Sequence, residues 1–140
     1  MATAILYYSL GGHTRAYAEK MAAEINAEVF EIREIKKRNG FTAFIPGLFQ
    51  AKGMKRTAIF PLDNDLARYN EIIIMGPIWA SLPAPAVNSA IDLLPSGKSV
   101  SLVCTSGRGG FDLSKTAELI KERECDVKEI RCLGAHELQA

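Results

Sequence analysis

Short apolar runs alternate along the whole chain with amphipathic stretches, and this alternation limits the fold more than any other feature. Five runs have the length and residue types of strands: Ala4–Tyr8, Val29–Ile35, Ile72–Met75, Val100–Cys104 and Val127–Leu133. Between the first two, apolar residues recur at helical spacing, as at Ala18, Met21, Ala22 and Ile25. Apolar strands separated by helices are typical of a parallel sheet that is covered on both faces.

Two further stretches repeat the helical spacing, one with Val87, Ala90, Ile91 and Leu94 and one with Leu113, Ala117 and Ile120. The chain has 140 residues, of which 48% are hydrophobic and 24% charged. These values predict one globular α/β domain over residues 1–140. The least regular segment is 36–70, where Phe41, Phe44, Ile45, Leu48 and Phe49 predict a short kinked helix on the sheet. The alternative is that some of these rings border a ligand.

Charge and cysteine content exclude several classes of function. The net charge is +1, so no overall field favours nucleic acid or a membrane surface. No apolar run approaches about 18 residues, and no leader pattern is visible, so we expect a cytoplasmic protein without membrane partners. Three cysteines without a CxxC pair, and two histidines, predict no metal site. A basic run from Arg33 to Arg56 is a solvated surface or a docking patch for an anionic partner.

A polar loop with two glycines follows the first strand and leads directly into a helix. It consists of Ser9, Leu10, Gly11, Gly12, His13 and Thr14. Glycine lets the backbone approach an anion closely, and the first amides of a helix point at such an anion. The hydroxyls of Ser9 and Thr14 add uncharged donors, while the GxxxxGK[ST] and GxGxxG patterns are absent. The loop predicts a site for a single terminal phosphate, and a helix start without any ligand is the alternative.

Two more loops follow strands whose carboxyl ends lie at the same edge of a parallel sheet, where ligands bind in such folds. The third strand leads into Pro77, Ile78, Trp79, Ala80 and Ser81. Core packing does not obviously require Trp79, so its ring is predicted to stack on a flat heterocycle; filling a gap under the loop is the alternative. The fourth strand leads into Thr105, Ser106, Gly107, Gly109 and Gly110. Backbone groups left bare by these glycines can contact the polar edge of a ring.

Taken together, the three loops resemble those of the flavodoxin family. The motifs are Tyr8-Ser9-x-x-Gly12-x-Thr14, Pro77-Ile78-Trp79 and Cys104-Thr105-Ser106-Gly107, and the resemblance spans nearly the whole chain. It implies a flavodoxin-like doubly wound sheet of five parallel strands in the order 2-1-3-4-5, with one FMN bound non-covalently. The first loop would hold the FMN phosphate, the second would cover one face of the flavin, and the third would lie beside its pyrimidine end.

The sequence departs from the family at several places. His13 replaces a common Asn, Ala80 stands where many flavodoxins have Gly, and the chain is not acidic. The chain ends six residues after Gly134, so we expect the closing helix of the family to be missing. Apolar side chains of the fourth and fifth strands would then lie open on the face of the first helix. A homodimer would cover this face, and the alternative is that the segment Phe41–Phe49 covers it.

The resemblance implies electron transfer or flavin-dependent reduction. We predict an electron carrier that serves redox partner proteins and has no catalytic residues of its own. The alternative is an NAD(P)H-dependent FMN or quinone reductase, which needs room for nicotinamide over the flavin; no signature for that cofactor is visible. A phosphoacceptor receiver of the same topology is excluded, because Tyr8-Ser9 and Met75-Gly76 stand where it would need acidic residues.

Overall fold

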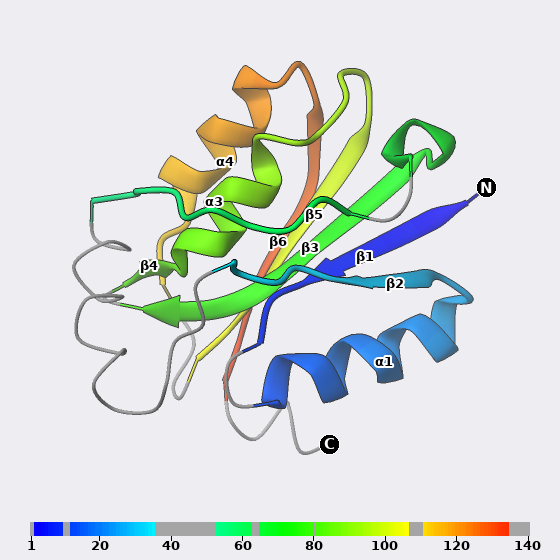
Figure 1. The fold of residues 1–140 in the computed structure, drawn as a ribbon, viewed down its shortest axis with the longest axis horizontal. Helices are drawn as coiled ribbons and strands as arrows, with labels where there is room; N and C mark the ends of the chain where they lie inside the picture. The colour runs from blue at the N-terminus through cyan, green and yellow to red at the C-terminus, as the bar shows by residue number, and fades with distance from the viewer. Residues whose placement is uncertain are drawn as a thin grey trace.

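The fold is a parallel sheet with helices on both faces (Figure 1). A computed structural model describes residues 2–9, 12–35, 53–62, 65–79, 81–106 and 111–134. Its elements in chain order are β1 (Thr3–Tyr7), α1 (His13–Ile25), β2 (Glu28–Glu31), the 3₁₀ helix η1 (Leu66–Arg68), β3 (Glu71–Trp79), β4 (Leu82–Pro83), α3 (Pro85–Ile91), β5 (Ser99–Thr105), α4 (Ser114–Glu122) and β6 (Asp126–Leu133).

The five long strands are all parallel and lie in the order β2-β1-β3-β5-β6, while the short β4 pairs antiparallel with β3. In chain order these five strands have the 2-1-3-4-5 arrangement predicted from the resemblance. The three central strands are buried along almost their whole length. Burial on both faces explains why their sequences are continuous apolar runs rather than alternating ones.

Two apolar layers hold the helices to the sheet. The larger layer contains Val87 and Ile91 of α3 and Ile120 of α4, together with every second residue of the central strands. The smaller layer contains Ala18 and Ala22 of α1 and the residues that point to the opposite face. Figure 1 shows α1 on one side of the sheet and α3 with α4 on the other. Because β1, β3 and β5 run parallel, their carboxyl ends lie together at one edge of the sheet, between the two layers.

The edge strand β2 is shorter than the predicted run Val29–Ile35. It ends at Glu31, and the chain beyond it pairs antiparallel with another segment through a bridge between Glu34 and Ile59. The amide of Ile35 donates to the carbonyl of Ala58 at 3.0 Å. Sequence periodicity could not reveal this pairing, because the two segments are far apart in the chain and neither is strongly apolar.

The segment 53–62 is attached to α3 by polar contacts. The Ser89 hydroxyl accepts from the amide of Thr57 at 2.9 Å and donates to its carbonyl at 2.6 Å. The Asn88 side chain donates to the carbonyl of Lys55 at 3.2 Å, and Arg56 forms an ion pair with Asp92 at 3.0 Å. Residues 36–52 and 63–64 of the irregular region, which include the predicted helix Phe41–Phe49, lie outside the described residues.

The α1 face of β5 and β6 differs from the open apolar surface that the sequence predicted. Val103 of β5 is 2% exposed. Its partner on β6 is Arg131, which forms an ion pair with Glu129 on the same face at 3.6 Å. The prediction of an open apolar strip is therefore wrong for the described residues, because the apolar side chain is buried and the edge strand presents charged residues. The homodimer stays a prediction, but an open apolar surface on this face no longer supports it.

Candidate functional site at the carboxyl edge of the sheet

The loop between β1 and α1 is closed by one of its own side chains. The Ser9 hydroxyl accepts a hydrogen bond from the amide of Gly12 at 2.9 Å. Gly12 has a φ of 93°, in the left-handed region, and is the N-cap residue of α1. Glycine adopts this conformation without a steric penalty. Ser9 and Gly12 thus hold the chain in a turn immediately before the helix, and His13 and Thr14 are the first two residues of α1.

Among the described residues, the start of α1 lacks the two side-chain features that normally stabilise the free amides of a helix start, a capping side chain and an acidic residue. Within the described part of the chain, no side-chain hydrogen bond caps the helix, and its first turn contains no acidic residue. The first amides of a helix lack partners within the helix and carry the positive end of its dipole. Arg15, at the third helical position, forms an ion pair with Glu19 at 3.1 Å. The turn therefore presents uncharged donors, which is the chemistry predicted for a terminal phosphate.

A pair of buried hydroxyls joins the first loop to the third. The Oγ1 atoms of Thr14 and Thr105 lie 2.9 Å apart, and both residues are buried. Thr14 is the second residue of α1 and Thr105 is the last residue of β5, so the bond fixes the helix start against the sheet edge. The next residue, Ser106, donates its amide to the carbonyl of Leu133 at 2.9 Å. The structure thus brings together residues of two predicted loops that are 91 positions apart.

The end of β3 forms a narrow hairpin with β4, so Pro77, Ile78 and Trp79, predicted to lie in a loop, belong to the strand. Ile78 pairs with Pro83 and Trp79 with Leu82, and the amide of Ala84 donates to the carbonyl of Pro77 at 3.0 Å. Ser81 has a φ of 71°, a left-handed conformation that a tight turn requires. Pro77, Ile78 and Ser81 are therefore held by backbone pairing at the same sheet edge as the other two loops.

Trp79 lies in the core, contrary to the prediction that core packing does not require it. Its side chain is 5% exposed and belongs to the larger apolar layer. Its ring meets the ring of Tyr8 edge-on, with centroids 5.9 Å apart. Packing under the loop was the weaker interpretation of this residue, and the structure supports it. Stacking of Trp79 on a ligand stays a prediction.

Tyr8 and Glu34 form a buried polar contact that no pattern in the sequence predicts. The Tyr8 hydroxyl donates to the Glu34 carboxylate, and both side chains are largely buried. Tyr8 follows β1 and Glu34 follows β2, so the contact links two carboxyl-end segments directly behind the predicted site. No spacing rule connects residues of these types across 26 positions.

Several candidate residues lie outside the described part of the chain. These are Leu10, Gly11, Ala80, Gly107, Gly109 and Gly110. Their predicted roles in the phosphate loop, the tryptophan loop and the glycine-rich loop stay predictions. Beyond the last loop, the Asp112 carboxylate accepts from the amide of Ser114 at 3.0 Å. This hydrogen bond lowers the pKa of Asp112 and helps to start α4.

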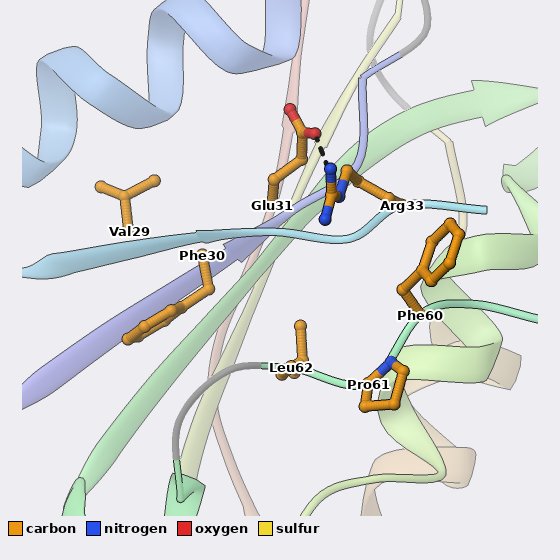
Figure 2. A pocket seen from close by; sticks show the side chains of 7 residues that line it. All are labelled: Val29, Phe30, Glu31, Arg33, Phe60, Pro61 and Leu62. Carbon is orange, nitrogen blue, oxygen red and sulfur yellow. Dashed lines mark ion pairs between the residues drawn. The ribbon is translucent and has the colours of Figure 1, made fainter. Parts of the chain in front are cut away.

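A groove along the edge of the sheet is separate from the predicted site. Its volume is about 250 Å³, and it is lined by Val29, Phe30, Glu31, Arg33, Phe60, Pro61 and Leu62. Figure 2 shows Glu31 and Arg33 of this groove facing each other, with an ion-pair distance of 3.9 Å. The Arg33 guanidinium also lies 5.5 Å from the centre of the Phe60 ring. The two charges of the groove are thus already partnered, and none of its residues was predicted to bind a cofactor.

The described ranges contain no cluster of three or more metal-ligating side chains. Across the same residues, no helix has the length and apolar character needed to cross a membrane.

Known proteins resemble this chain in structure more clearly than in sequence. No family model matches the chain, and no curated protein matches it. Among solved structures, a flavoprotein from Lactobacillus acidophilus NCFM in complex with FMN is 26% identical, with a TM-score of 0.76 over 94% of this chain and 92% of that one. A flavodoxin from the domain Archaea is 17% identical, with a TM-score of 0.59 over 99% of this chain and 90% of that one.

A third similar structure is described as an NADPH-quinone reductase from P. pentosaceus. It is 12% identical, with a TM-score of 0.56 over 99% of this chain and 92% of that one. At this identity the likeness shows the fold alone. The strand order, the helices on both faces and these structural likenesses lead to the same conclusion: the chain has the flavodoxin-like fold of the flavoproteins.

Proposed function

We propose that this protein binds one FMN non-covalently at the carboxyl ends of β1, β3 and β5 and transfers electrons between partner proteins. The observation that carries the proposal is the start of α1, which has a left-handed glycine, no acidic residue in its first turn and no side-chain cap among the residues that the structure describes. Such a helix start suits a phosphate group. The likeness to a flavoprotein in complex with FMN supplies the identity of the group.

The residues at this edge fit the phosphate end of FMN. The Ser9 hydroxyl accepts from Gly12 through its oxygen, so its proton remains available for a phosphate oxygen. The Thr14 hydroxyl is held by Thr105 and can take the same role. With Arg15 paired to Glu19, binding would rely on amides and hydroxyls rather than on a cation. FMN, when bound, would supply the capacity to accept and return electrons one or two at a time.

The first test compares flavins of different charge. The purified protein should show the visible absorption of a flavin, or acquire it when FMN is added. Riboflavin lacks the phosphate and should bind much more weakly than FMN in a fluorescence titration. Equal affinity for the two flavins would remove the phosphate assignment of the Ser9–Thr14 loop.

The second test removes one hydroxyl and preserves its shape. A hydrogen bond to a charged group contributes about 1.5–3 kcal/mol, so Thr14→Val should weaken FMN binding roughly 10-fold or more. Thr116→Val is the matched control, because Thr116 is also a buried threonine on a helix but lies on α4, and none of the predicted site loops includes it. The control should bind FMN with unchanged affinity. An equal loss in both variants would point to a general effect on folding instead of a phosphate contact.

A third experiment separates the electron carrier from the reductase alternative. The FMN-loaded protein is mixed with NADH or NADPH under argon, and the flavin absorption is followed. For an electron carrier we expect no bleaching by either nucleotide and rapid bleaching by a reductase protein or dithionite. Fast bleaching by one of the nucleotides, with turnover of an added quinone, would favour the NAD(P)H-dependent reductase.

A further inference from the structure

Two of the three cysteines lie directly opposite each other on neighbouring strands. Cys104 of β5 is the register partner of Cys132 of β6, and the two strands run side by side in Figure 1. Paired residues of neighbouring strands point to the same face of the sheet, and such strands lie about 4.8 Å apart. Disulfides span Cα separations of about 4.4–6.8 Å. The fold therefore places these two thiols within reach of one another.

The two thiols have different access to solvent. Cys104 is 0% exposed and belongs to the apolar layer under α3 and α4. Cys132 is only partly buried. It lies on the last strand of the sheet, and Ile130, two residues earlier on the same face, is 41% exposed. An oxidant in solution can therefore reach Cys132 but not Cys104.

The difference in burial also assigns the chemical roles. Burial raises the pKa of the Cys104 thiol, and the nearby Cys132 raises it further. Cys104 therefore stays protonated at neutral pH. The thiolate is the form that reacts with oxidants, so the first reaction belongs to Cys132, with Cys104 as the second thiol.

We propose that Cys104 and Cys132 form a reversible disulfide when the protein meets a peroxide. The Cys132 thiolate sulfur attacks a peroxide oxygen, the O–O bond breaks, and a sulfenic acid and hydroxide result. The Cys104 sulfur then attacks the Cys132 sulfur, and the S–O bond breaks as the S–S bond forms. The hydroxyl leaves with the Cys104 proton as water. In total the two thiols lose two electrons and two protons, and hydrogen peroxide is reduced to two waters.

A bond between Cys104 and Cys132 would lie beside contacts of the candidate site. The pair immediately precedes Thr105 and Leu133 in the two strands, next to the Thr14–Thr105 and Ser106–Leu133 hydrogen bonds.

The test counts thiols in the full chain before and after treatment with hydrogen peroxide. The protein has three cysteines, and we expect one free thiol after oxidation and unfolding in denaturant. A peptide map under non-reducing conditions should link the Cys104 peptide to the Cys132 peptide. Dithiothreitol should restore all three thiols.

Two variants complete the test. Cys132→Ser changes a partly exposed residue and should lose the oxidation, keeping both of its thiols. Cys125→Ser is the matched control, because the Cys125 thiol is buried and donates to the carbonyl of Pro95 at 3.1 Å. This control should form the same disulfide at a rate within about twofold of the unchanged chain. Three remaining thiols in the unchanged chain, a link through Cys125, or a Cys132 sulfinic acid beside a free Cys104 would each overturn the proposal.

Discussion

Thr14 and Thr116 are both buried threonines on helices, yet their hydroxyls have different surroundings. The Thr14 hydroxyl is bonded to Thr105, whereas the Thr116 hydroxyl is buried without a partner among the described residues. An unpartnered buried hydroxyl is unfavourable, and a partnered one is not. The sequence pattern could single out Thr14, because it follows a strand and a glycine turn. It gave no sign that Thr116 is different from any other helical threonine.

At this scale we expect Thr116→Val to stabilise the protein. The substitution replaces an unpartnered buried hydroxyl with a methyl group of similar size, which should raise the free energy of unfolding by about 1 kcal/mol. Thr14→Val should have the opposite effect, because it leaves Thr105 without its partner. Urea unfolding of both variants checks the pair. A stabilised Thr14→Val variant would contradict the hydroxyl contact seen in the structure.

Gly76 of β3 is required for a different reason, since a helix packs directly on it. A Cβ atom built at this position would lie 2.3 Å from Cγ2 of Val87 on α3. Valine has little rotational freedom in a helix, so the helix itself would have to move. We expect Gly76→Ala to lower the free energy of unfolding by about 1–3 kcal/mol, as overpacked cores do.

A double variant identifies the cause of that loss. Because Val87→Ala removes the clashing methyl group, the double variant Gly76→Ala/Val87→Ala should be less destabilised than the sum of the single variants. Gly97 serves as the control: it has a φ of 80° and open space around it. Gly97→Ala should be destabilising through its backbone alone, and its effect should simply add to that of Val87→Ala.

At the scale of elements, the edge strand β2 and the segment directly after it are held by three tyrosine–glutamate contacts. Glu28, Glu31 and Glu34 accept from the hydroxyls of Tyr69, Tyr7 and Tyr8, respectively. Glu31 points to the α1 face and the other two glutamates to the opposite face, so the strand is attached from both sides. The predicted order 2-1-3-4-5 already placed this strand at the edge of the sheet. The tyrosine partners of the glutamates come from β1 and from the end of η1, and only the folded structure brings them together.

These contacts should differ in strength according to burial. Tyr8→Phe keeps the ring but leaves the Glu34 carboxylate, which is 9% exposed, without one of its donors. The expected loss is about 1–3 kcal/mol. Tyr7→Phe is the matched control: the Glu31 side chain is 40% exposed and water can replace the hydroxyl, so less than about 1 kcal/mol should be lost. Equal losses in urea unfolding would mean that burial does not set the strength of these contacts.

For the whole molecule, the sequence predicted the architecture better than the details of the site. The covered parallel sheet followed from the apolar runs and the helical spacing, because strands buried on both faces are continuously apolar. The strand order came from the resemblance alone. The hairpin of β3 with β4 and the docking of 53–62 on α3 were not predicted, because backbone pairing and single hydroxyl contacts leave no such signal. Trp79 shows the same limit: its position in the chain was informative, but only packing decides whether its ring is buried.

The strand order also determines when the sheet can form during synthesis of the chain. β1 lies between β2 and β3, and its register with β3 begins at Thr3 and Glu71. The unit β1-α1-β2 can assemble from local contacts as soon as its residues leave the ribosome, but one edge of β1 then stays unpaired until β3 has been made. Long-range parallel pairing of this kind is slow. A chain that ends before Glu71 would therefore expose the apolar edge of β1 and should aggregate rather than remain in solution.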